Sequence, residues 1–150
     1  MMNLARRIIS CVLSLVLLVV VPLISTSCYG WQAAQRAGNE AATQQDLKTI
    51  AAVEIQYYNT HNRTFGTLDQ MIKERMLTSR FSGSPPTADG YVFNLNVIPK
   101  TSSQPTSYTL HADPQSAATG KNHFYIDSNS STIHVNPDQP ASATDPRLGE

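Results

Sequence analysis

Pairs of histidine and aspartate are the residues in this chain whose types and spacing could do chemistry. His111 and Asp113 alternate along one stretch, and His123 and Asp127 lie four residues apart in another. Zinc sites need three or four convergent ligands with defined geometry, and neither pair has an evident third member. The sequence therefore predicts no zinc site.

The stretch DSNSS, residues 127–131, offers a different chemistry. It places oxygen-bearing side chains at alternating positions, as calcium loops do, which makes Asp127, Asn129 and Ser131 the calcium candidates of the chain. The stretch lacks the glycine and the closing glutamate of such loops. An Asx turn that closes a hairpin is the alternative interpretation.

Motifs for catalysis are not found. The chain has no glycine-rich phosphate loop and no G-x-S-x-G sequence, and its two cysteines, Cys11 and Cys28, both lie in or beside an apolar N-terminal segment. The formal net charge is zero, so bulk electrostatics give no reason to expect nucleic acid as a partner. We expect a protein that is not an enzyme, binds no cofactor and binds no nucleic acid.

The apolar N-terminal segment is predicted to be a membrane anchor. From Ile8 to Ile24 there is no charged residue, and 13 of 17 positions are Val, Leu or Ile. With the residues that follow, this run is long enough to cross a bilayer, and the two arginines before it favour a cytoplasmic N-terminus. The sequence thus predicts a single-pass protein of the bacterial inner membrane, anchored by residues 1–31, with its head periplasmic or extracellular and the membrane as a partner.

Two other fates of this segment stay open. A signal peptide would be cleaved near the small residues Ser25 to Ser27. A lipoprotein signal would end at Cys28, the possible lipidation site, although Ser25 stands where leucine is usual.

Residues 32–136 form the predicted head, which begins with a helix from Asn39 to about His61. Leu47, Ile50 and Tyr57 recur at helical spacing on one face, so we expect them in the core. Glu54 falls near the middle of that apolar stripe, where a carboxylate is costly unless it is paired or bonded to backbone N–H groups. We interpret Glu54 as a structural carboxylate; a subunit contact or an ion ligand is the alternative.

A second, short helix is predicted to begin at Thr67, which forms a capping-box pattern with Gln70. In residues 82–90 the two prolines and Gly90 predict a loop. Four strands are expected after it, at residues 91–98, 107–112, 123–127 and 132–135.

Short links between these strands predict an antiparallel meander, and the sheet face is the only partner large enough to bury the stripe of the helix. The predicted fold class is therefore α+β: an N-terminal membrane helix, then an amphipathic helix packed on a four-stranded antiparallel meander. Residues 137–150 lack apolar content and are predicted to be a flexible tail.

Four stretches of the head follow one another in a recognisable order. NEAATQQDLKTIAAVEIQYYNT (residues 39–60) matches an NEA…LRTI…AE…Y helix, and DGYVFNL, SYTLHADP and HFYIDSNSSTIHVN match three strand patterns. In these stretches, which cover residues 39–136, the chain resembles the type IV pilin and type II secretion pseudopilin superfamily, and most closely its small bacterial pilin-like members.

The resemblance implies a pilin-like head and a structural or accessory role in a type IV pilus or a type II secretion-like system. It also implies other pilin-like subunits or secretion machinery as partners. Glu54 falls on the helix glutamate of the family pattern, which favours its structural interpretation. Some pseudopilins bind calcium in a loop near residues 127–131.

The N-terminal end departs from the family. Pilins carry a glycine at the peptidase cut site before the apolar helix and a glutamate early in that helix, whereas the first glycine here is Gly30 and the first acid is Glu40. The prepilin cleavage motif is thus not found, and we expect an accessory protein that does not form filaments by itself. The alternative function is a secreted or lipid-anchored periplasmic binding module that reuses the pilin head.

Overall fold

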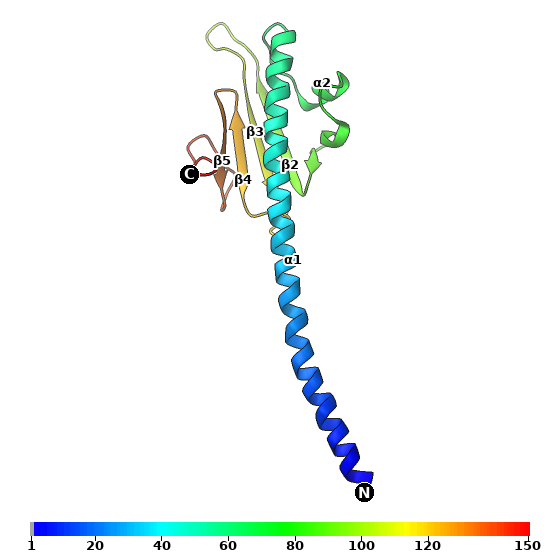
Figure 1. Ribbon diagram of the computed structural model, residues 1–150. Coiled ribbons are helices and arrows are strands. Elements are labelled where there is room, and N and C mark those ends of the chain that lie inside the picture. The colour runs from blue at the N-terminus through cyan, green and yellow to red at the C-terminus, as the bar shows by residue number, and fades with distance from the viewer. Residues whose placement is uncertain (1) are drawn as a thin grey trace. The chain divides into compact units, whose positions relative to one another are not determined.

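A computed structural model describes the backbone of residues 2–150 and the side chains of residues 30–150. The chain divides into two compact units, residues 1–35 and residues 36–150. The elements in chain order are the helices α1 (Met2–Thr60) and α2 (Leu68–Lys73), the 3-10 turn η1 (Ser79–Phe81), and the strands β1 (Thr87–Ala88), β2 (Tyr91–Ile98), β3 (Ser107–Pro114), β4 (His123–Asp127) and β5 (Ser130–Asn136) (Figure 1).

The strands form one antiparallel sheet in the order β1-β2-β3-β4-β5. The predicted four-stranded meander was wrong, because the sheet has a fifth strand inside the segment predicted to be a loop. In β1, Thr87 and Ala88 pair with Val92 and Tyr91. Two prolines precede this pair, and proline, which cannot donate to a ladder, is tolerated at a sheet edge. A strand of two residues is too short to show an alternating pattern in the sequence.

The predicted membrane helix is also contradicted. Over residues 30–150, whose side chains are described, no helix is both long enough and apolar enough to cross a bilayer. Within that range α1 carries charged residues such as Arg36 and Glu40 at short intervals. This finding contradicts the predicted membrane helix of the fold class and the single-pass inner-membrane localisation. The run from Ile8 to Ile24 and Cys28, on which the signal-peptide and lipidation predictions depend, lies outside the described side chains.

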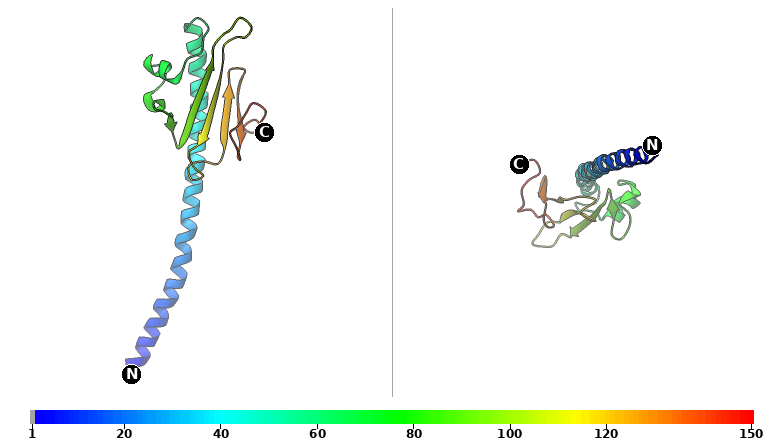
Figure 2. Two further views of the ribbon diagram at one scale, coloured as in Figure 1. Left: turned by 180° about the vertical axis from the view of Figure 1, so that it is seen from behind. Right: turned by 90° about the horizontal axis from the view of Figure 1, so that it is seen from below.

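The core of the head lies between α1 and one face of the sheet, as the views from behind and from below show (Figure 2). From α1, Leu47 and Ile50 are fully buried and Tyr57 is 6% exposed. From the sheet, alternate residues of each strand meet them, including the buried Phe93, Leu110 and Phe124. The helix face expected from the sequence is therefore the buried face.

The capping box at the start of α2 is confirmed. The Gln70 backbone N–H donates to Thr67 Oγ1 at 3.3 Å, and the Thr67 N–H donates to Gln70 Oε1 at 2.8 Å. These two bonds satisfy donors that the first turn of a helix otherwise leaves free.

The C-terminal segment, residues 137–150, lies against the outer edge of β5. The Val135 N–H donates to the Pro146 carbonyl, the Leu148 N–H donates to the Ile133 carbonyl, and Ala141 is 1% exposed. These contacts argue against the flexible tail that the composition predicts. They use backbone groups, which the apolar content of a segment does not reveal.

Candidate functional site

The carboxylate of Glu54 lies at the centre of the buried stripe of α1. Its side chain is fully buried, Oε2 accepts a hydrogen bond from the Gly66 backbone N–H at 3.0 Å, and Oε1 has no hydrogen-bond partner. Burial raises the pKa of Glu54 to about 7, against the opposing effect of the Gly66 N–H. Glu54 therefore joins α1 to the loop before α2 through a carboxyl group that changes charge near neutral pH.

Gly66 can take this position because it has no side chain. A Cβ atom at residue 66 would lie 3.0 Å from the ring of Tyr57, which is tighter than most contacts of a Cβ atom in proteins, so the ring would have to shift. Glycine at residue 66 thus lets the loop approach Tyr57 and reach Glu54 without displacing the ring.

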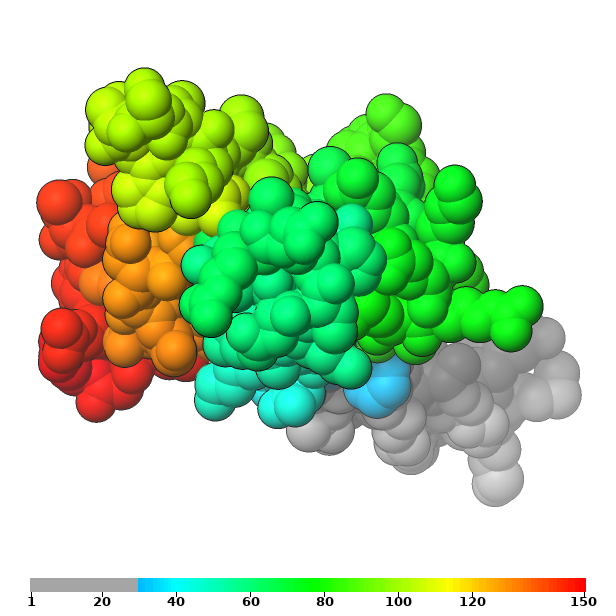
Figure 3. Space-filling model, turned by 90° about the horizontal axis from the view of Figure 1, so that it is seen from above, coloured from blue at the N-terminus to red at the C-terminus, as the bar shows by residue number. Residues whose placement is uncertain are grey.

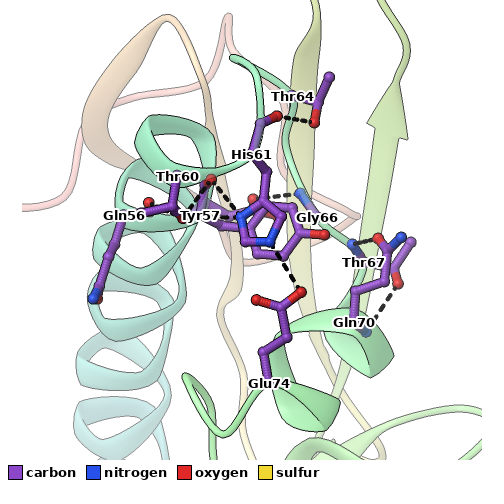
Figure 4. Close-up of polar contacts among 10 residues, drawn as sticks. Gln56, Tyr57, Thr60, His61, Thr64, Gly66, Thr67, Gln70 and Glu74 are labelled. Carbon is purple, nitrogen blue, oxygen red and sulfur yellow. Dashed lines mark hydrogen bonds and ion pairs between the residues drawn. The ribbon is translucent and has the colours of Figure 1, made fainter.

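A second set of contacts lies at the C-terminal end of α1, close to Glu54 in the chain (Figure 4). The rings of Tyr57 and His61 are stacked, with centroids 3.7 Å apart and planes 4° apart. The His61 Nε2 atom lies 3.0 Å from Glu74 Oε1 at the end of α2, while His61 Nδ1 lies 3.0 Å from the Tyr57 carbonyl oxygen. Both imidazole nitrogens and one Glu74 oxygen therefore have partners within the protein. The arrangement can hold α1, the loop and α2 together, and it presents no nucleophile.

An ion-pair cluster that the sequence reasoning missed joins α1 to the segment before the sheet. Arg80 Nη2 lies 2.6 Å from Asp46 Oδ2 and 2.5 Å from Asp89 Oδ2. Burial raises the pKa of Asp46 to about 6, Arg80 opposes that rise, and Asp89 adds to it. Asp46 lies eight residues before Glu54 on the same face of α1, so the periodicity that singled out Glu54 could also have found it.

Glu40, nearer the start of the head, also joins α1 to a loop. Its Oε1 accepts from the Lys121 N–H at 2.8 Å, and its Oε2 accepts from Asn122 Nδ2 at 2.7 Å. The loop between β3 and β4 is thereby tied to α1. In that loop Gly120 approaches Tyr91 so closely that a Cβ atom would lie 2.0 Å from the phenol oxygen.

The calcium candidates lie in the β4–β5 hairpin, where they form the Asx turn that was the alternative interpretation of this stretch. Asp127 Oδ1 accepts from the backbone N–H groups of Asn129 and Ser130, each at 2.9 Å, and Oδ2 accepts from the Tyr125 hydroxyl at 3.0 Å. This is an Asx turn. Ser131 is an exposed residue of β5. Over residues 30–150, no group of three His, Cys, Asp or Glu side chains could hold a metal ion.

One histidine of the sheet, His123, pairs with an aspartate of the neighbouring strand and not with Asp127 of its own strand. His123 Nδ1 lies 2.5 Å from Asp113 Oδ1, because β3 and β4 pair Ala112 with Phe124. His123 also lines a surface hollow of about 310 Å³ together with Arg36 and Lys121. The carboxylates of Asp113 and Glu40 lie beside this hollow, since Asp113 contacts His123 and Glu40 accepts from the Lys121 backbone N–H.

Comparison of the chain with protein-family models, with curated proteins and with solved structures found no match. The described residues define a fold class, an α-helix packed on a five-stranded antiparallel sheet. The resemblance to the pilin superfamily stays a prediction from the sequence.

Proposed function

We propose that this chain is a non-enzymatic, pilin-like structural protein, an accessory component of a type IV pilus or of a type II secretion-like system. The observation that carries the proposal is the packing of one amphipathic helix on an antiparallel meander. One helix buries the stripe containing Leu47, Glu54 and Tyr57 against a meander whose strands lie side by side in chain order. The sequence stretches that resemble pilins supply that helix and those strands.

The polar groups of the head support a structural role. Glu54, Asp46, Glu40 and Asp127 each bind backbone N–H groups or an arginine of another segment. Catalytic acids and bases need reach to a substrate proton, whereas these carboxylates are directed at partners within the fold. Each of them holds a loop or a turn against the helix or sheet beside it.

Deletion of the gene in its own bacterium tests the proposal. We expect the deletion strain to lose surface pili or type II secretion, and an epitope-tagged full chain to restore the lost activity and to appear with pilins or pseudopilins in the corresponding complex. Gly120→Ala, which places a methyl group against Tyr91, is the control for a disrupted head and should not restore it. Unchanged piliation and unchanged secretion in the deletion strain would reject the proposal.

A further inference from the structure

The surface hollow of about 310 Å³ gathers basic side chains from three elements of the head. Arg36 belongs to α1, Lys121 to the loop between β3 and β4, and His123 to the start of β4. This loop passes beside α1 at the end of the sheet that is lower in Figure 1. None of the described residues that line the hollow is acidic.

The side chains of Arg36 and Lys121 have no carboxylate partner. Among residues 30–150 neither of them forms an ion pair. Within the same range the Arg36 guanidinium makes one hydrogen bond, from Nη1 to the Ala117 carbonyl oxygen at 3.4 Å. That long bond directs the guanidinium at the loop and leaves its other donors available. Both cations can therefore donate to a ligand in the hollow.

The third basic side chain, His123, is oriented by an aspartate. Its Nδ1 atom lies 2.5 Å from Asp113 Oδ1, and its side chain is 19% exposed. A carboxylate at one imidazole nitrogen fixes the ring and leaves the other nitrogen, here Nε2, for a ligand. A molecule in the hollow thus meets an imidazole of fixed orientation beside the two cations.

The two carboxylates beside the hollow are directed at other groups of the protein. Glu40 Oε1 accepts from the backbone N–H groups of Lys121 and Asn122, at 2.8 Å and 3.3 Å, and Oε2 accepts from Asn122 Nδ2 at 2.7 Å. Asp113 contacts His123. These carboxylates lower the positive potential, but they leave the side-chain donors of Arg36 and Lys121 unoccupied. The lining of the hollow therefore favours an anion.

We propose that this hollow binds the phosphate group of a small phosphate ester. Arginine binds phosphate through its planar fork and lysine binds it as a point charge. The three basic side chains approach from a helix, a loop and a strand, and a tetrahedral phosphate can direct separate oxygens to them, whereas a carboxylate has only two oxygens in one plane. The volume is at the lower end of the range for small-molecule sites, which leaves room for a small organic group, and Ser116 offers that group a hydroxyl. The proposal does not depend on the proposed function.

Titration of the isotope-labelled full chain, followed by NMR, tests the site. At pH 7 and constant ionic strength, which holds the screening of charges fixed, inorganic phosphate should shift the amide resonances of Gly120 and Lys121, and acetate should shift them less. Glucose 6-phosphate and glycerol 3-phosphate are titrated in parallel. The tighter of the two shows whether the ester resembles a sugar phosphate or a lipid headgroup.

Two variants should weaken phosphate binding. Lys121→Ala removes one cation and keeps the backbone N–H that bonds Glu40, and Arg36→Gln removes the other. Each should raise the dissociation constant about threefold to fivefold, which is the size of an exposed charge contact.

Lys100→Ala is the matched control, because Lys100 is an exposed lysine in the segment after β2, at the opposite end of the sheet. The view from above shows that end, with this segment in yellow-green and the β4–β5 turn in orange (Figure 3). The control should bind phosphate as the wild type does. Unmoved resonances of Gly120 and Lys121, equal shifts with acetate and phosphate, or equal binding by Lys100→Ala and Lys121→Ala would each overturn the proposal.

Discussion

Neutralising the buried carboxylate of α1 by Glu54→Gln should abolish the pH dependence that this site gives to the stability of the fold. Burial raises the pKa of Glu54 from its ordinary value of 4.5 to about 7 in the folded chain. Between those two values the folded state binds more protons than the unfolded state, so the free energy of unfolding falls as pH rises. The stabilising protonated form is fully populated below about pH 4.5, and its contribution is lost by about pH 7 to 8.

The magnitude follows from the distance between the two pKa values. Each pH unit in that window changes the free energy of unfolding by about 1.4 kcal/mol, so the full effect is about 3 kcal/mol. Glutamine cannot ionise, and its carbonyl oxygen can still accept from the Gly66 N–H. The stability of Glu54→Gln relative to the wild type should therefore rise by about 3 kcal/mol between pH 4.5 and pH 8.

Denaturant unfolding of the full chain measures this difference. Near-ultraviolet circular dichroism of tyrosine is a suitable probe, because Tyr57, Tyr91 and Tyr108 are buried in the head. Glu150→Gln is the control, since Glu150 is an exposed carboxylate at the C-terminus, and its profile should run parallel to that of the wild type. A parallel profile for Glu54→Gln as well would refute the reasoning, because Glu54 would then not titrate in this window.

Three further test substitutions, two of them with a control variant, examine the packing of the head through the same unfolding measurement. Leu47→Ala should lower the free energy of unfolding by about 2–5 kcal/mol, because Leu47 is fully buried. Lys48→Ala should cost well under 1 kcal/mol, because Lys48 is exposed. Equal denaturant midpoints for the two variants would show that the buried face of α1 is assigned wrongly. Gly66→Ala should cost about 1–3 kcal/mol through its clash with Tyr57, while Gly38→Ala, in open space on α1, should be neutral or stabilise by up to about 1 kcal/mol; a harmless Gly66→Ala would contradict the close approach. Arg80→Ala should cost about 1 kcal/mol at pH 7, because the Arg80 side chain is 45% exposed and solvent screens the pair. The loss should be smaller at pH 5, where Asp46, with its pKa of about 6, is mostly protonated; a loss that does not change with pH would argue against the ion pair.

Helical periodicity was enough to predict the buried face of α1 and the anomaly of Glu54. The stripe repeats every three or four residues, and the structure buries Leu47, Ile50 and Tyr57 in it. Alternation predicted β2 with its observed bounds, because side chains on one face of a strand must meet the core, and the strand-like run before a hairpin turn predicted β4 with its observed bounds. The partner of Glu54 could not be predicted, since the Gly66 N–H is brought to it by the path of a loop.

Contacts that depend on how one segment pairs with another could not be predicted from the sequence. The His123–Asp113 contact depends on the register of β3 against β4, and a histidine pattern along one strand says nothing about that register. The Arg80 cluster joins Asp46 of α1 to Arg80, which lies 34 residues later in the chain, and to Asp89. β1 and the contacts of the C-terminal segment rest on backbone hydrogen bonds, to which side-chain composition gives no signal.

The central claim, that this chain works beside pilins or pseudopilins, is tested most directly by photo-cross-linking in living cells. Ile55 is 54% exposed on the helix of the head, so a photoreactive amino acid can replace it without disturbing the core. Irradiation followed by mass spectrometry should identify, at residue 55, a protein that carries a prepilin-type N-terminal sequence. A product with no such protein, in cells whose pilus or secretion system is assembled, would contradict the account.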